Sequence, residues 1–187
     1  CTMADEVFTL IKAGCTFEEL NNYLLQLPIE QDSLHLILNR RNVDRYSPFH
    51  CAIFARNLDA CRVLFKYGAD VNMKCHGSPC LHLALSTAML PGAMEFGLEL
   101  FQMLVENGAD CAAKDDQLAG ILHLAAEYNL DAVLTKLLNN AALELEVDGK
   151  DRGGLRPLHR AAQRDASAAA TALLAEGASM GAQNSYG

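Results

Sequence analysis

The sequence lacks any apolar run that reaches the ~18 residues needed to cross a bilayer. Its best candidate, 80–94, is interrupted by two hydroxyl residues and by Pro91-Gly92. The basic, apolar and small-residue segments of a secretory signal are not found at its start. We therefore expect no membrane insertion.

Cysteine is too scarce for a scaffold built on disulfides, with seven in 187 residues, an odd number. Most lie in apolar patterns, as Cys51 does between Phe49 and Ile53, where a free thiol behaves as a small buried hydrophobe. We expect an intracellular protein, cytoplasmic or nuclear. Because residue 1 is Cys rather than Met, we also expect a fragment of a larger protein.

Basic residues are rare in the middle of the chain. Between residues 75 and 149 there are two, against eleven acidic ones, and the whole chain carries a net charge of −8. An acidic chain repels phosphate backbones and anionic membrane surfaces, which disfavours nucleic-acid and membrane binding. With 51% hydrophobic and 20% charged residues, the composition is that of a folded domain.

A tetrapeptide ending in histidine occurs four times, followed each time by an alanine-rich stretch. The copies are Ser47-Pro48-Phe49-His50, Pro79-Cys80-Leu81-His82, Gly120-Ile121-Leu122-His123 and Arg156-Pro157-Leu158-His159. The distance from the histidine to a second landmark, a Gly-Ala pair or its variant, is 18 residues in three copies. In the copy at His82 it is 26, so eight residues are added there.

This pattern resembles the ankyrin repeat, a unit of about 33 residues with a hairpin and two antiparallel helices. The resemblance implies an all-α solenoid of about five helix–turn–helix units joined by β-hairpin loops. The histidine opens the inner helix, where its ring can bond to neighbouring backbone and tie adjacent hairpins together. Alanines let inner helices stack closely, and glycine after the outer helix supplies a left-handed cap.

Five units follow from these landmarks. The first, 1–42, is a degenerate repeat in which Thr16 and Glu19 have capping-box spacing and 28–35 forms an extended linker or extra turn. The others are 43–74, 75–114 with an insertion at about 86–97, 115–150, and 151–187, which also holds the start of a further, truncated repeat.

Three departures from the repeat predict irregular structure. Ala141 replaces the capping glycine, and the hairpin after it is three residues longer than usual. The step from Gly68 to His82 is one residue short. The insertion in the third unit forms a projecting loop, or it extends the inner helix and packs Leu90 and Phe96 back on the array.

Metal binding and catalysis find little support. Cys75, His76, Cys80 and His82 are zinc-ligand types, but the paired C-x2-C spacing is missing, and packing roles are favoured for Cys80 and His82. Four of six histidines belong to the tetrapeptide, and the chain has no Gly-rich phosphate loop or G-x-S-x-G motif. We expect no enzyme activity, no metal and no cofactor.

Arginines recur every fourth residue in the fifth unit, at Arg152, Arg156, Arg160 and Arg164. They either anchor an acidic partner or compensate the acidic fourth unit, and the sequence leaves both possibilities open.

The family resemblance places partner contacts on the concave face, at the hairpin tips and the exposed side of the inner helices. The matching positions also include Cys75, Thr87 and Ala119. Ten residues are predicted to bind a partner protein or peptide: Tyr46, Phe54, His76, Asp116, Gln117, Glu127, Tyr128, Arg152, Gln163 and Arg164.

The expected function is therefore protein binding, by a monomer that serves as the scaffold or targeting arm of a larger protein. Two alternatives remain. In the first alternative, the chain is the substrate-recognition region of a multidomain enzyme or effector whose catalytic domain lies elsewhere. In the second, it is a spacer within a longer array and has no dedicated partner.

Overall fold

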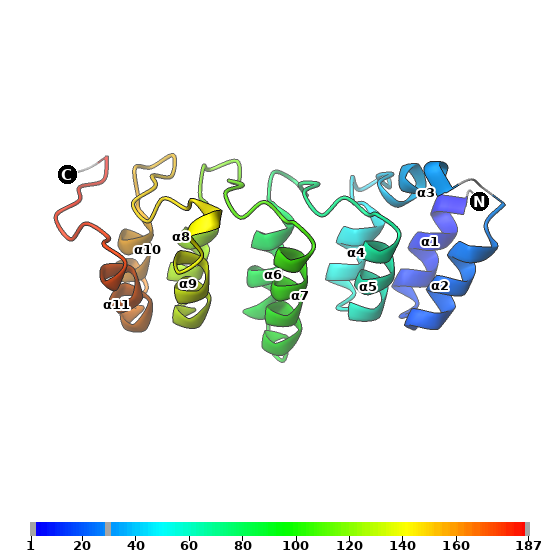
Figure 1. Ribbon diagram of the computed structural model, residues 1–187, viewed down its shortest axis with the longest axis horizontal. Helices are drawn as coiled ribbons and strands as arrows, with labels where there is room; N and C mark the ends of the chain where they lie inside the picture. The colour runs from blue at the N-terminus through cyan, green and yellow to red at the C-terminus, as the bar shows by residue number, and fades with distance from the viewer. Residues whose placement is uncertain (1–2, 29–30, 186–187) are drawn as a thin grey trace.

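A computed structural model describes residues 3–28 and 31–185. These residues form short helices and connecting turns (Figure 1). In chain order the helices are α1 (Met3–Lys12), α2 (Phe17–Gln26), α3 (Gln31–Leu38), α4 (Pro48–Phe54), α5 (Leu58–Lys66), α6 (Cys80–Ala88), α7 (Met94–Glu106), α8 (Ile121–Glu127), α9 (Asp131–Leu138), the 3₁₀ helix η1 (Ala141–Leu143), α10 (Pro157–Gln163) and α11 (Ser167–Ala175).

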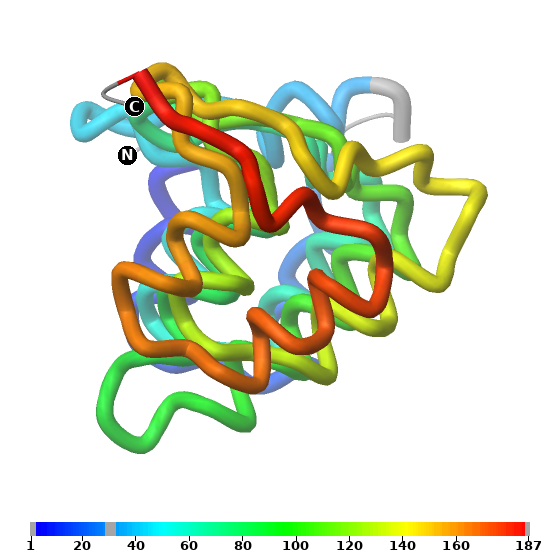
Figure 2. The backbone as a smooth tube through the Cα atoms, turned by 90° about the vertical axis from the view of Figure 1, so that its left-hand side faces the viewer, coloured from blue at the N-terminus to red at the C-terminus, as the bar shows by residue number. Residues whose placement is uncertain are grey.

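The helices stand in antiparallel pairs along one axis, with the connecting hairpins on one side of the row (Figure 1). The inner helices α1, α4, α6, α8 and α10 pack in succession, and each pairs with an outer helix (Figure 2). One isolated bridge, between Cys75 and Ser78, is the sole β-structure in the described residues. The prediction of an all-α repeat solenoid is confirmed.

Small residues bring the inner helices together. Ala52, Ala84, Ala125 and Ala161 all follow a tetrapeptide histidine by two residues, and each is completely buried between neighbouring helices. A larger side chain at these positions would force the units apart, because interiors are close-packed. The outer helices contribute leucines to the same core, among them Leu64.

Histidine rings connect successive units. The Nε2 atoms of His50, His123 and His159 bond to the carbonyl oxygens of Met73, Leu155 and Ala182, at 3.0, 3.1 and 2.9 Å. Each acceptor lies in the next hairpin along the array, as expected from the sequence. The repeated histidine therefore serves the fold rather than catalysis.

A second set of inter-unit bonds runs along the hairpins. Asn39 Oδ1 accepts the N–H of Asp70, and Asn72 Oδ1 accepts the N–H of Asp110, at 2.7 and 2.8 Å. The corresponding residue of the next hairpin is Ala112, which has no side-chain acceptor. In the unit that follows Ala112, the chain after α9 forms η1, and Glu144 adopts a φ of 47°. The connection after Ala141 is therefore irregular, as predicted.

The interpretation of the first unit needs one correction. Its capping box is present, with Glu19 Oε2 accepting the N–H of Thr16 at 2.8 Å. Of the segment expected as an extended linker or extra turn, 28–35, residues 29–30 lie outside the described part of the chain, and residues 31–35 belong to α3. Leu34 and Leu38, four residues apart, are both buried, and this helical period was overlooked beside the hairpin-like sequence that follows.

The insertion lengthens both helices of the third unit. α6 has nine residues against seven in α4, α8 and α10, and α7 has thirteen, so this pair extends past its neighbours (Figures 1 and 2). Gly97 permits close contact with Ala88, because a Cβ there would lie 2.5 Å from the Ala88 backbone. Phe96 packs on the core, whereas Leu90 is half exposed. Each of the two expected arrangements is therefore correct only in part.

Candidate functional site: the concave face

The predicted contact residues fall into two groups on the hairpins and inner helices, the side of the array that the family resemblance names as its concave face. Tyr46, Phe54 and His76 belong to the second and third units. The other seven belong to the fourth and fifth: Asp116, Gln117, Glu127, Tyr128, Arg152, Gln163 and Arg164. Three matching positions offer no surface, because Cys75, Thr87 and Ala119 are buried.

An aromatic cluster joins the second and third units. The Tyr46 ring lies between those of Phe54 and His76, edge-on to both, with centroid distances of 5.1 and 5.2 Å. Tyr46 packs partly on the core, whereas His76 is exposed and half of the Phe54 surface is accessible. Phe54 is thus a large apolar side chain held in place by neighbours and open to solvent.

The third hairpin is one residue shorter than the second, which matches the short step from Gly68 to His82 and places His76 in this cluster. Asn42 and Tyr46 bracket the second hairpin, but Cys75 and Ser78 bracket the third, which is one residue shorter. The shorter turn requires left-handed backbone at both His76 (φ 45°) and Gly77 (φ 83°). Gly77 is needed for a second reason, since a Cβ there would overlap the Asp116 carboxylate.

Charges between the fourth and fifth units neutralise one another. Arg160 bonds Glu127 at 3.0 Å and the buried Asp151 at 2.7 Å, and Arg164 bonds the second oxygen of Glu127 at 2.6 Å. Arg156 likewise pairs with Asp148 at 3.0 Å. These contacts support the compensating role of the arginine series, and they leave Glu127 with both oxygens occupied.

Burial and hydrogen bonding oppose each other at Asp151. Burial alone would raise the pKa of this carboxyl group, but bonds from Arg160 and from the N–H groups of Leu155 and Gly153 together lower it. Asp151 is therefore an ionised, fully bonded side chain. Arg152 and Gln163 are exposed.

A polar pocket of about 280 Å³ opens on the concave face between the third and fourth units. Its walls include Ser78, His82, Ser86, Asp115 and Tyr128. Asp115 Oδ1 caps its own hairpin by accepting the N–H groups of Gln117 and Ala119, and the Ser86 and Tyr128 hydroxyls lie 3.3 Å apart. Among the described residues, Asp115 Oδ2 has no hydrogen-bond partner.

His82 in this pocket differs from the other tetrapeptide histidines. In those, Nδ1 accepts the N–H of the residue three positions earlier, for example from Gly120 to His123 at 3.1 Å. The equivalent of Gly120 is Pro79, which has no N–H to donate. His82 is 3% exposed, and neither ring nitrogen makes a hydrogen bond within the described part of the chain.

Burial lowers the pKa of His82 to about 4, against the opposing effect of the nearby Asp115 carboxylate. The backbone of Ala113 lies close enough to the ring to oppose this shift, but not in the geometry of a hydrogen bond. The ring is therefore neutral near pH 7, and a proton on Nε2 leaves Nδ1 as a buried acceptor without a donor. The importance of His82 and Asp115 was missed from the sequence, although Pro79 in the first tetrapeptide position was the signal for it.

The four clustered metal-ligand types do not converge. Cys80 Sγ contacts the Met73 carbonyl oxygen at 3.3 Å, and burial raises the pKa of its thiol to about 12, which keeps it protonated. Within residues 3–28 and 31–185, no three His, Cys, Asp or Glu side chains are placed to share a metal ion.

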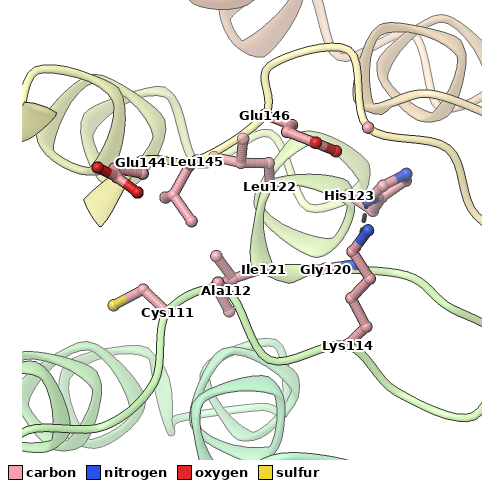
Figure 3. Close-up of a pocket in the computed structure, with 11 residues that line it drawn as sticks. Cys111, Ala112, Lys114, Gly120, Ile121, Leu122, His123, Glu144, Leu145 and Glu146 are labelled. Carbon is pink, nitrogen blue, oxygen red and sulfur yellow. Dashed lines mark hydrogen bonds between the residues drawn. The ribbon is translucent and has the colours of Figure 1, made fainter. Parts of the chain in front are cut away.

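A second hollow, of about 240 Å³, lies beside the irregular connection after α9 (Figure 3). Leu145 points into it toward Ile121, and Lys114 and Glu144 lie at its edge. Both ring nitrogens of its histidine, His123, are occupied, and burial raises the pKa of its thiol, Cys111. This hollow offers apolar packing, and its thiol is not an activated nucleophile.

No helix in the described part of the chain combines the length and apolar character needed to span a bilayer.

Comparison with known proteins identifies the repeat. A model of ankyrin repeats in three copies matches residues 16–115 and 90–184. The chain is also 25% identical over 169 residues to transient receptor potential cation channel subfamily A member 1 of Drosophila melanogaster. That match covers 87% of the chain but 13% of the channel protein. With the helical stack and its histidine ties, these matches show that the chain belongs to the ankyrin repeat family, a general protein-interaction module.

Proposed function

We propose that this chain binds a partner protein or peptide along its concave face, as the scaffold or targeting arm of a larger intracellular protein. The observation that carries the proposal is the aromatic cluster of Tyr46, Phe54 and His76. Exposed aromatic side chains held rigid by neighbours lose little entropy on binding and tend to dominate interface energies.

The charged residues of the concave face differ in how freely they can contact a partner. Glu127 and Arg164 already pair with each other, so a partner has to compete for them. Asp116, Gln117, Arg152 and Gln163 are exposed. We expect the aromatic cluster to supply most of the affinity and these polar residues to act chiefly on orientation and association rate.

The host protein also belongs to the proposal. The Drosophila melanogaster relative described above is a cation channel about eight times longer than the matching segment, which supports a role as one region of a larger chain. An enzyme with a separate catalytic domain remains the alternative host. Among the described residues, neither pocket holds a thiol whose pKa is lowered, so catalysis is assigned to neither of them.

The test is affinity capture from cell extract with a Phe54→Ala/His76→Ala variant, followed by mass spectrometry. Both side chains are exposed, so the fold should persist, which an unchanged melting temperature would establish. Tyr46 and Tyr128 are unsuitable because each packs partly on the core. A matched Phe17→Ala/Leu25→Ala variant alters exposed side chains of α2 instead.

We expect the concave variant to lose partners that the unaltered chain and the α2 variant both capture. Equal capture by all three proteins would contradict the concave-face assignment. The exposed tip of the insertion, Met89 to Met94, would then be the next surface to test.

A further inference from the structure

The pocket between the third and fourth units is an incomplete copy of the charged junction that follows it. Two positions define the comparison. Directly after the tetrapeptide histidine stand Leu124 in the fourth unit and Arg160 in the fifth. Four residues after that histidine stand Ser86 in the third unit and Glu127 in the fourth.

In the complete junction, the Arg160 guanidinium fills the space between two carboxylates. It bonds Asp151 Oδ2 at 2.7 Å and Glu127 at 3.0 Å. The residue equivalent to Asp151 is Asp115, since each caps its hairpin through two backbone N–H groups. Leu124 replaces the arginine of the fourth unit in this pocket. The one cation that lines the pocket, Arg160 of the fifth unit, already pairs with Asp151 and Glu127.

His82 gives a second and independent sign that a group is missing. Its side chain lines the same pocket, is nine-tenths buried, and has an acceptor nitrogen that Pro79 cannot satisfy. A buried acceptor without a donor is costly to leave unpaired. A donor supplied from outside would satisfy it.

We infer that this pocket binds the guanidinium group of an arginine side chain presented by the partner protein. Asp115 Oδ2, His82 Nδ1 and the hydroxyl pair of Ser86 and Tyr128 are the acceptors. They are distributed around the pocket, which suits the several N–H donors of one planar guanidinium better than a single ammonium.

The surrounding charge agrees with a cationic occupant. Among the residues that line the pocket, Asp115 and Glu127 carry negative charges and Arg160 carries a positive one. Glu127 and Arg160 already pair with each other, which leaves Asp115 as the lining charge that attracts a cation. The inference rests on the proposed function, since the arginine belongs to the partner.

The probe is N-acetyl-arginine amide, titrated into the isotopically labelled chain and followed by NMR. We expect saturable shifts of the His82 ring nitrogens and of the Ser86 and Gln117 amides. N-acetyl-citrulline amide has nearly the same shape without the charge, and it should produce no saturable shift.

Three variants sharpen the test. Asp115→Asn keeps the hairpin cap, as Asn42 does in the second unit, and should weaken binding about tenfold, the value expected for one charge-assisted bond. Leu124→Arg should fill the pocket with the chain's own guanidinium and abolish binding. Leu25→Arg adds the same charge on α2, away from the pocket, and should leave binding unchanged.

Arginine-selective shifts that are lost in Asp115→Asn and in Leu124→Arg would support the inference. Equal shifts with citrulline, equal binding by Asp115→Asn, or no saturable shift at all would overturn it, the last outcome indicating a pocket filled by water. The capture experiment with the Phe54 variant is independent of these outcomes. A failed titration with successful capture would therefore reject the arginine pocket alone.

Discussion

Two successive junctions of the concave face place different side chains on the same backbone. Between the fourth and fifth units, Arg160 bridges Asp151 and Glu127, and His123 has partners on both ring nitrogens. Between the third and fourth, the equivalent aspartate, Asp115, pairs with no cation of the described residues, and both ring nitrogens of His82 lack a partner among them. The comparison teaches that three residues separate a self-satisfied junction from an open one: Pro79 in the tetrapeptide of the third unit, Ser86 in place of Glu127, and Leu124 directly after the tetrapeptide of the fourth unit.

Acidification should expose this difference most strongly. The folded pKa of His82, about 4, lies below its ordinary value near 6.5, so the unfolded chain takes up the proton first as the pH falls. The stability that the neutral His82 ring contributes to the folded state is fully present above pH 6.5, and it is lost as the pH falls toward 4. We expect the free energy of unfolding to fall by about 3 kcal/mol from this residue. Urea unfolding at a series of pH values measures it.

A His82→Gln variant is the control for that titration. Burial lowers the pKa of His50 and His123 as well, so the unaltered chain and the variant share their contributions. The variant should show a shallower loss of stability on acidification. Identical pH profiles would contradict the account of His82 as a buried, unpaired ring.

Removing the bridging cation should disrupt the closed junction. Arg160→Ala leaves Asp151 buried beside Glu127 without its main partner, and we expect a loss of about 2 kcal/mol, reduced from the cost of a fully buried pair because Arg160 is partly exposed. Chemical denaturation at pH 7 measures the effect. A loss below that of Arg164→Ala would show that the bridge does not hold the junction together.

Giving His82 a donor should strengthen the open junction. Pro79→Ser restores the backbone N–H and adds a hydroxyl, the arrangement that Ser47 has with His50 at 3.1 and 2.7 Å. We expect a gain of about 1 kcal/mol, because the restored bonds outweigh the lost rigidity of proline. Thermal unfolding measures it, and a lower melting temperature would contradict the proposed cause of the unpaired ring.

The exposed ion pair should matter least. Arg164 is 62% exposed, so Arg164→Ala should change the free energy of unfolding by less than about 0.5 kcal/mol. The same denaturation experiment at low and high salt measures this. A large, salt-independent loss would place Arg164 in the structural network with Arg160.

The repeat pattern made the array, the histidine ties and the irregular connection after Ala141 predictable, because each depends on spacing along the chain. α3 was missed because its short helical period is followed by a hairpin-like sequence. The pairing of Arg160 and Arg164 with Glu127 was left open, since a charge contact between units depends on side-chain directions. The aromatic cluster was foreseen as separate residues, but not as one group.

Hydrogen exchange of the chain bound to its captured partner tests the concave-face proposal most directly. We predict that binding slows amide exchange in the hairpin segments 42–46, 75–78 and 115–119 and leaves α5, α7 and α9 unchanged. Protection confined to those outer helices, or to the tip of the insertion, would contradict the account.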